Sequence, residues 1–466
     1  MKCSLTAATL GMALCATPSL AEMVAPFDVS NDQGVFLIVT DIHFDPFALP
    51  DIVPDLDAAD VPQWAEIFAK GAGDDFENYG SDAGYPLTAS ALKAASELPL
   101  KYDYVLYTGD YLSHDFELDY NRYAGRSPQG LTSFSVKTAQ YVSDAINTAV
   151  PDVPLIGIMG NTDAICGDYM IAPESDFTKG VKSQWMQLTQ QPDAFDHFDL
   201  GGYYKVEHPT VPDHDIIVLN DIFWSTKYQD ACDPNGSTPG DAMMAWLEFQ
   251  LFDSKVQGRK VHLLLHIPPG VNAYSTSRGF GSCESKITPF WDPNYGAQFI
   301  ALMHDYADVV DYSFSGHTHM DSFSIINDAN GNPNIAGHIT PAISPIFGNN
   351  PAFTAYLYDR TNGDILDSAT FYLNNLEDAA MGAKPIWQLE YVFSEAYGTT
   401  DMSAESLVQT AKVIKNDNNA RNLFKKFYAA STDGTNPISD SNVTAFLCAQ
   451  TAVSPEKYKD CYCSSE

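Results

Sequence analysis

The chain has 466 residues, which exceeds the size of a typical single hydrophobic core and predicts two domains. Its 45% hydrophobic and 12% aromatic residues are typical of a globular protein. Acidic residues outnumber basic ones 60 to 25, giving a formal charge of -35. This charge argues against nucleic acid or an anionic membrane as a main partner, because such binding depends on Lys and Arg. We interpret it as a solubilising surface or an adaptation to a salty medium.

The first 21 residues have the pattern of a secretory signal peptide. Lys2 is followed by an apolar segment at 5–20 and by small residues at 19–21, which predicts cleavage before Glu22. Cys15 leaves a lipoprotein as an alternative. No later stretch is long enough to span a bilayer. We therefore expect a soluble exported protein, secreted or periplasmic.

Cysteines fit an exported protein, because disulfides persist outside the cytosol. Removing the predicted signal peptide leaves six of the eight cysteines, which allow fifteen pairings. Their spacing does not indicate a zinc ribbon, so structural disulfides are favoured. These six are Cys166, Cys232, Cys283, Cys448, Cys461 and Cys463.

Strands alternating with helices predict a layered α/β domain in which helices cover a sheet. A polar, acidic loop is expected at 44–85, between the first strand and the first helix. Strands are expected at 35–40, 104–107, 154–159, 215–220, 260–265 and 311–315. Helices are expected at 87–98, 132–150, 242–252 and 295–306.

The pattern changes after residue 321. Short strands at 322–327, 334–340, 355–358 and 367–373 indicate a second sheet or an extension of the first. Helical patterns at 403–415, 418–430 and 442–451 then predict a smaller C-terminal helical domain that contains cysteines. The expected organisation is a signal peptide at 1–21, a catalytic domain at 22–383 and a C-terminal domain at 384–466.

Five predicted strands end in Asp, Asn or His side chains, at the edge where α/β sheets bind ligands. Each residue alone could have a purely structural role. Asp110 and Asn161 could form turns or cap helices, and His266 could be a hydrogen-bonded histidine of the core. Five such ends are much harder to assign to chance. The residues are Asp41, His43, Asp110, Asn161, His266, His317 and His319.

Seven nitrogen and oxygen ligands are too many for one four-coordinate ion but suit two divalent ions. Asp110 stands alone after its strand, so it is the candidate bridging carboxylate. Two ions about 3.5–4 Å apart activate a water and hold both oxygens of an in-line displacement, which suits phosphoesters. The mixed donor set favours zinc, with iron or manganese as alternatives.

The same residues resemble the five-block signature of calcineurin-like metallophosphoesterases. The blocks are Asp41-x-His43, Gly109-Asp110, Gly160-Asn161-x-Asp163, His266 and Gly316-His317-x-His319. A finer resemblance to acid sphingomyelinase and the sphingomyelinase-like phosphodiesterases covers nearly the whole mature chain. It is carried by His114, Gly316 to Asp321, Thr340-Pro341-Ala342, Asn350-Pro351, Trp387 to Gly398 and Leu447 to Gln450. The resemblance implies a sandwich of two sheets flanked by helices, followed by the small C-terminal helical domain.

The family also implies how the residues act. One metal ion would be held by Asp41, His43 and His319. The other would be held by Asn161, His266 and His317, with Asp110 as the bridge. Implied disulfides join Cys232 to Cys283 and Cys448 to Cys461, which leaves Cys166 and Cys463 unassigned.

Two departures from the family pattern bear on activity. Thr162 occupies a position where family members usually carry a histidine that faces the phosphate, and a hydroxyl is no general acid near neutral pH. His114 matches the other histidine proposed for that role, so we place His114 and Asn161 in the catalytic machinery; otherwise His114 is an exposed loop histidine. The saposin domain of acid sphingomyelinase has no counterpart before the first strand, which resembles the saposin-free phosphodiesterases.

These features predict a secreted dimetal phosphodiesterase in which a metal-bridging hydroxide attacks phosphorus. The expected substrate is a soluble nucleotide-type phosphodiester or a phospholipid head group such as that of sphingomyelin. A polyphosphate hydrolase ranks lower, because an acidic surface suits a polyanion poorly. A non-catalytic metal-binding homologue disabled by Thr162 is the alternative from a different class.

Overall fold

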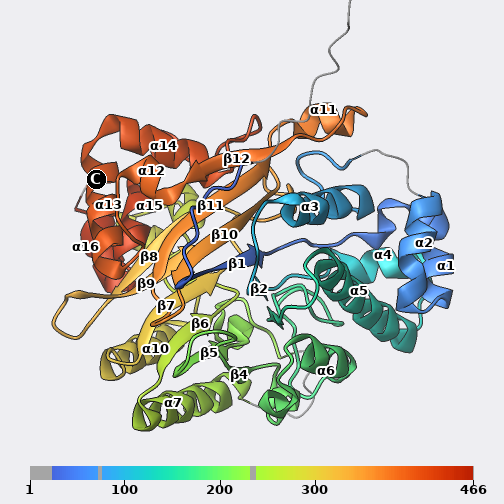
Figure 1. Cartoon of the computed structure of the whole chain (residues 1–466), viewed down its shortest axis with the longest axis horizontal. Helices are drawn as coiled ribbons and strands as arrows, with labels where there is room; N and C mark the ends of the chain where they lie inside the picture. Colours follow the sequence, from blue (N-terminus) through green and yellow to red (C-terminus); the bar gives the residue numbers. More distant parts are fainter. Residues whose placement is uncertain (1–23, 72–75, 231–237, 465–466) are drawn as a thin grey trace, which may run out of the picture.

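The computed structural model describes residues 24–71, 76–230 and 238–464, which form two six-stranded β-sheets flanked by helices (Figure 1). The strand order is β12-β11-β10-β1-β2-β3 in the first sheet and β4-β5-β6-β7-β9-β8 in the second. This arrangement confirms the predicted sandwich. The predicted signal peptide, residues 1–21, lies outside the described residues.

The first sheet contains β1 (Gln33–Val39), β2 (Tyr104–Tyr107), β3 (Leu155–Gly157), β10 (Ala352–Asp359), β11 (Ile365–Leu373) and β12 (Trp387–Val392). The second contains β4 (Tyr204–Glu207), β5 (His214–Val218), β6 (Lys260–Leu264), β7 (Val310–Ser315), β8 (Ser322–Asn327) and β9 (Pro333–Ile339).

Helices surround both sheets. The first nine are α1 (Val53–Ala58), α2 (Val61–Gly71), α3 (Tyr85–Glu97), α4 (Phe116–Tyr123), α5 (Pro128–Ala149), α6 (Asp176–Leu188), α7 (Pro239–Gln257), α8 (Ala273–Arg278) and α9 (Cys283–Lys286). The later ones are α10 (Pro293–Asp305), α11 (Leu376–Ala380), α12 (Phe393–Tyr397), α13 (Ala404–Asn416), α14 (Asn418–Tyr428), α15 (Val443–Thr451) and α16 (Pro455–Tyr462). Short 3-10 helices are η1 (Pro46–Ala48), η2 (Pro50–Ile52), η3 (Pro192–Phe195), η4 (Phe198–Leu200) and η5 (Asp221–Trp224).

The core lies between the two sheets, where their inner faces meet. Phe36 on β1 stacks between Tyr104 and Tyr356 within its own sheet, with centroid distances of 4.7 and 4.8 Å. Its ring edge also meets Phe314 on β7 of the other sheet at 5.3 Å. Such aromatic rings bury large apolar areas and prefer stacked or edge-to-face contacts. The contact holds the central strands of the two sheets face to face.

Parallel pairing brings the strand ends of interest to one edge of each sheet. In the first sheet β1, β2 and β3 pair in parallel, and in the second β5, β6 and β7 do so. Parallel strands buried on both faces carry continuous apolar runs, as Val-Phe-Leu-Ile-Val in β1 illustrates. The loops after β1, β2, β3, β6 and β7 can therefore meet at one site.

The prediction of a polar loop at 44–85 was wrong for much of this segment, because η1, η2, α1 and α2 lie within it. Trp64 and Phe68 are four residues apart on α2, so they share one helix face. Both are buried, and the Trp64 ring packs against Phe134 and Tyr141 of α5 at 5.2 and 5.6 Å. The acidic residues of the segment obscured this narrow apolar stripe.

The C-terminal helices α12 to α16 gather at the upper left of Figure 1, where α12 packs on β11 and β12. Helix α13 contacts β8 and β9, and α15 contacts β8. The strand β12 lies after the predicted domain boundary at residue 384, yet it pairs with β11 as the edge of the first sheet. The boundary itself stays a prediction.

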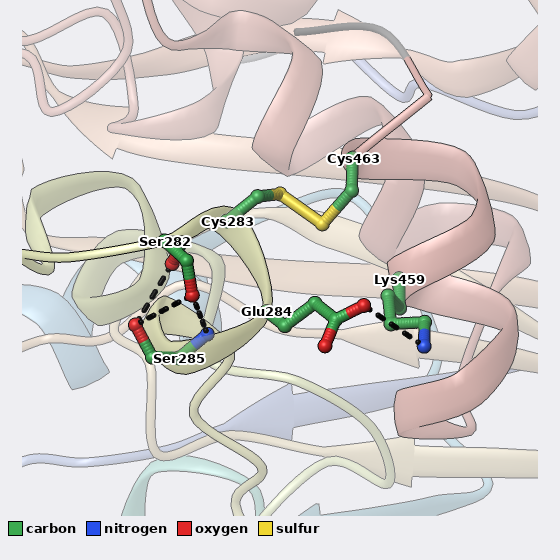
Figure 2. The surroundings of a disulfide bond; sticks show 6 residues. All are labelled: Ser282, Cys283, Glu284, Ser285, Lys459 and Cys463. Atoms are coloured by element: carbon green, nitrogen blue, oxygen red, sulfur yellow. Dashed lines mark hydrogen bonds and ion pairs between the residues drawn. A yellow bond between two sulfur atoms is a disulfide. The ribbon is translucent and has the colours of Figure 1, made fainter.

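Two disulfides are described in the C-terminal region. Cys448 pairs with Cys461, as the resemblance implied. The implied pairing of Cys283 with Cys232 was wrong, because Cys283 on α9 pairs with Cys463 just after α16 (Figure 2). An ion pair of 3.2 Å between Glu284 and Lys459 joins the same two helices. Both links fasten the last helix to the phosphoesterase-like part of the chain.

The other two cysteines are only partly described. Cys166 also takes part in a disulfide, and Cys232 lies outside the described residues. Among the residues that the structure describes, no helix is long and apolar enough to cross a membrane.

Candidate metal centre

Five of the seven expected ligands adopt left-handed backbone conformations directly after their strands. Their φ angles are 45° for Asp41, 46° for His43, 60° for Asp110, 66° for His317 and 63° for His319. Such conformations cost of order 1–3 kcal/mol each in a non-glycine residue and concentrate at functional sites. The sharp turns they make direct side chains from three strands toward one point.

Gly109 makes this convergence possible. Its φ is 100°, and a Cβ there would lie 2.7 Å from both Gly160 N and His266 Nδ1. No larger residue fits such a close approach without displacing the neighbouring loop. The close approach of Gly160 and His266 therefore explains why a glycine precedes Asp110.

One half of the centre is built by Asp41, His43 and His319. The Nε2 atoms of His43 and His319 are 3.0 Å apart. Asp41 Oδ1 lies 3.6 Å from His319 Nε2, and all three side chains are buried. Their ligand atoms lie within 4.8 Å of one another, so they could hold one metal ion.

The other half is built by Asn161, His266 and His317. His266 Nε2 lies 3.0 Å from Asn161 Oδ1 and 3.2 Å from His317 Nδ1. Asp110 Oδ2 lies between the halves, 3.2 Å from His266 Nε2 and 3.3 Å from His43 Nε2. The Asp110 carboxylate thus lies within reach of both halves.

The outer ring nitrogens fix how three histidines point. The Nδ1 atoms of His43, His266 and His319 lie 3.0, 2.7 and 3.3 Å from the carbonyl oxygens of Leu112, Thr108 and Ser344. A carbonyl can only accept, so each Nδ1 donates and each Nε2 faces inward. Metal-binding histidines usually donate their outer ring N–H to a carbonyl or carboxylate oxygen in this way.

Carboxylates that sequence reasoning left without a role support the ligand loops. Asp163 accepts hydrogen bonds from the backbone N–H groups of Asp110, Tyr111, Leu112 and Gly160. Asp221 accepts from those of His266 and Ile267. Asp168 accepts from Asn161 Nδ2 at 2.6 Å, which turns the amide oxygen inward. Asp163 was visible in its motif and Asp221 followed a predicted strand, whereas nothing in the sequence marked Asp168.

The centre carries a strong negative field around Asp110. Burial lowers the pKa of His43 and His266, but the Asp110 carboxylate overrides it and raises these values to about 9 and about 10. Burial raises the pKa of Asp41 to about 6, although His266 and His43 act to lower it. Only protons or metal cations can neutralise this set of inward-facing donors, so the residues fit a cation site.

His114 stands beside this centre and is half-buried. Its ring stacks on His43 with centroids 4.3 Å apart. Asp82 accepts from the His114 backbone N–H at 2.7 Å and lies 3.1 Å from Nδ1, so the ring is held with Nε2 free. Ser344 Oγ donates to the same carboxylate at 3.0 Å. Asp82 came from the segment predicted as a loop, and no sequence signal singled it out.

Thr162 is buried and turned toward Asp110. Its backbone N–H donates to Asp110 Oδ1 at 2.9 Å. Its hydroxyl lies 3.0 Å from the same oxygen and 2.8 Å from the Leu112 carbonyl, one of which accepts its single proton. Thr162 therefore holds the Asp110 carboxylate in position.

Comparisons with known proteins agree with this geometry. Residues 34–321 match the family model of calcineurin-like phosphoesterases, and residues 333–466 match that of the acid sphingomyelin phosphodiesterase C-terminal region. The chain is 25% identical over 459 residues to cyclic GMP-AMP phosphodiesterase SMPDL3A of Rattus norvegicus, covering 95% of each chain. It is also 25% identical to acid sphingomyelinase-like phosphodiesterase 3b of Homo sapiens, covering 93% of this chain and 91% of the relative. A dimetal phosphatase from Danio rerio aligns with a TM-score of 0.43 and 13% identity, covering 72% of this chain and 95% of the other.

The chain therefore belongs to the calcineurin-like phosphoesterase family, whose fold carries a dinuclear metal site. Within that class it joins a calcineurin-like phosphoesterase domain to an acid sphingomyelinase C-terminal region, as in the sphingomyelinase-like phosphodiesterases. The resemblance seen in the sequence is confirmed. By family, the chain is a phosphoesterase.

Proposed function

We propose that the protein is an exported phosphodiesterase that uses two metal ions, most simply zinc, to cleave a nucleotide-type phosphodiester. The observation that carries this proposal is the convergence of six candidate ligand side chains around the carboxylate of the seventh, Asp110. One ion would be held by Asp41, His43 and His319, and the other by Asn161, His266 and His317. When bound, two divalent ions would activate a water and neutralise the phosphoryl oxygens.

The remaining residues have positioning and proton-transfer roles. Asp110 lies within reach of both halves, and Thr162 and Asp163 hold its loop. His114 stacks on His43 beside the centre, and its Nε2 would donate a proton to the departing oxygen. Asp82 holds the ring in that orientation through Nδ1. This assigns the acid role, lost at Thr162, to His114.

Aromatic side chains beside the candidate metal centre favour a nucleotide over other phosphodiesters as the substrate. Phe347 is 53% exposed, and its ring meets His319 and His114 with centroids 4.6 and 5.9 Å away. An exposed aromatic face beside the reacting phosphate can stack a base, an interaction worth about 1–3 kcal/mol. Lys227, over the Tyr169 ring at 4.9 Å, adds a cation near His317.

Turnover of three substrates separates the candidate functions. We expect a cyclic dinucleotide to be cleaved faster than sphingomyelin in vesicles or a long polyphosphate. Phe347→Ala should raise KM for the dinucleotide and leave a small aryl phosphodiester unaffected. Sphingomyelin as the best substrate would overturn the nucleotide assignment, and cleavage of none would favour a non-catalytic homologue.

The disulfides among the described residues support export. The Cys283–Cys463 and Cys448–Cys461 disulfides persist in oxidising compartments such as the periplasm or the extracellular space. The signal peptide that would direct the chain there stays a prediction.

A further inference from the structure

A second cluster of ligand-type side chains lies at the amino ends of the parallel strands in the second sheet. His214 is the first residue of β5, His262 the third of β6 and Asp311 the second of β7. These strands are neighbours in the sheet. Six residues of extended chain separate Asp311 from His317, so the cluster lies roughly 20 Å from the candidate metal centre. It belongs to the opposite edge of the sheet.

The three side chains converge at distances that hydrogen bonding does not explain. Asp311 Oδ1 lies 3.4 Å from His262 Nε2 and 3.7 Å from His214 Nε2. Hydrogen bonds between such atoms are normally 2.7–3.2 Å long. His214 Nε2 and Asp311 Oδ1 are buried without a hydrogen-bond partner. Buried polar atoms in native proteins rarely lack a hydrogen-bond partner. The gap between His214 Nε2 and Asp311 Oδ1 therefore needs an occupant.

The spacing suits ligands of one transition-metal ion. Tetrahedral zinc with bonds of about 2.0–2.1 Å separates its ligand atoms by roughly 3.3 Å. All three ligand atoms of His214, His262 and Asp311 lie within 4.8 Å of one another. The two histidine side chains are 1% and 2% exposed, whereas Asp311 is 29% exposed and gives a path from solvent.

A third histidine nearby shows what a satisfied ring looks like. His208 Nε2 lies 3.1 Å from the Tyr104 hydroxyl. Its Nδ1 accepts from the backbone N–H groups of Thr210 and Val211 at 3.3 and 3.1 Å. Both nitrogens of His208 are therefore used, and this ring has no lone pair left for a metal ion. His214 differs from it in having a free, buried nitrogen.

Two charged side chains outside the cluster, Lys260 and Asp364, interact electrostatically with Asp311, and their effects on its carboxylate have opposite signs.

We propose that His214, His262 and Asp311 bind a third divalent transition-metal ion, zinc by its donor set, at a structural site separate from catalysis. The ion would link the three neighbouring strands β5, β6 and β7 beneath the turn between β10 and β11, which covers the cluster. Gly363 in that turn has a φ of +83°, and a Cβ there would lie 2.6 Å from His214 Cε1.

Metal counting on matched variants tests this site. Asp311→Ala removes a ligand, whereas Asp364→Ala removes a nearby exposed carboxylate outside the ligand set. After loading with zinc chloride and gel filtration, we expect Asp311→Ala to hold one zinc fewer per chain than the wild type and Asp364→Ala to match the wild type. Turnover of an aryl phosphodiester should be similar in all three. Equal zinc in all three proteins, or equal losses in both variants, would overturn the proposal.

A measurement on the wild type keeps the proposal testable if Asp311→Ala does not fold. Anomalous diffraction at the zinc edge from zinc-soaked crystals should show a peak about 2.0–2.2 Å from His214 Nε2 and His262 Nε2. A map with peaks only at the catalytic centre would rule the third site out.

Discussion

At the scale of single residues, Asp110 and its neighbours account for most of the chemistry. Its carboxylate raises the pKa of two histidines that burial would lower, which shows how strongly this position attracts positive charge. Protons and metal ions compete for the same inward-facing atoms. Thr162 and Asp163, by contrast, act by holding Asp110 and its loop in place.

His114→Gln tests whether this residue is the general acid. We expect turnover of an alkyl phosphodiester to fall by about 10²–10⁴, the usual contribution of general acid catalysis. The loss should be much smaller with a p-nitrophenyl ester, because nitrophenolate leaves without a proton. Asp82→Asn should give a weaker form of the same pattern, since Asp82 only orients the ring. Equal losses for both leaving groups would indicate phosphate binding instead.

Thr162→Val tests the positioning role of that residue. The variant keeps the shape and the backbone N–H but removes the hydroxyl beside Asp110. Changes in second-shell partners typically cost 10–100-fold in metal affinity, so we expect zinc affinity measured by chelator competition to fall by about tenfold. Thr318→Val, between His317 and His319, serves as the control and should retain zinc normally. Unchanged zinc affinity in Thr162→Val would contradict the role.

At the scale of elements, local patterns predicted β2 and β8 at their observed bounds and placed the other ligand-bearing strands closely. Their continuous apolar runs and terminal Asp, Asn or His residues are local signals. The residues that support the ligands come from distant segments, such as Asp82, which meets His114 only in the folded chain. Pairings of this kind leave no periodic trace, and the Cys283–Cys463 bridge was missed for the same reason.

Strand β12 contains a buried acid that predicts a pH effect on stability. Glu390 Oε2 is buried without a partner, although part of the side chain is exposed, and Oε1 accepts from Ser431. Burial raises the pKa of Glu390 well above its ordinary value, and Asp321 raises it further. An acid with a raised pKa in the folded state stabilises it fully only below the unfolded pKa, and that stability is lost as pH rises.

Glu390→Gln should therefore stabilise the protein near pH 7. Each unit by which the pKa is raised is worth about 1.4 kcal/mol. We expect the difference in unfolding free energy between variant and wild type to grow as pH rises from about 4 to 7 and to vanish near pH 4. Exposed Glu405→Gln on α13 is the control and should show no such trend. A difference that does not change with pH would contradict this explanation.

At the scale of the whole molecule, the C-terminal helices are fastened to the rest by packing on β8 and β9 and by the Cys283–Cys463 bridge. That bridge spans 180 residues, whereas Cys448–Cys461 spans 13. Longer loops lose more entropy when closed, and a native disulfide contributes about 2–5 kcal/mol. The longer bridge should therefore stabilise the molecule more.

Paired alanine variants measure this difference. Replacing Cys283 and Cys463 together should lower the unfolding temperature more than replacing Cys448 and Cys461 together. Calorimetry of both variants beside the wild type gives the comparison. A larger loss for the short bridge would show that local packing around buried Cys448 outweighs chain entropy.

The central claim is that catalysis requires the metal centre built around Asp110. Its most direct test is turnover of an aryl phosphodiester by chelator-stripped protein before and after zinc is restored, for the wild type and for Asp110→Ala. We predict that stripped wild type is inactive, that zinc restores its activity, and that folded Asp110→Ala stays at least about 10³-fold slower because the bridging ligand is gone. Turnover by the stripped protein, or by Asp110→Ala at the wild-type rate, would contradict the dimetal account.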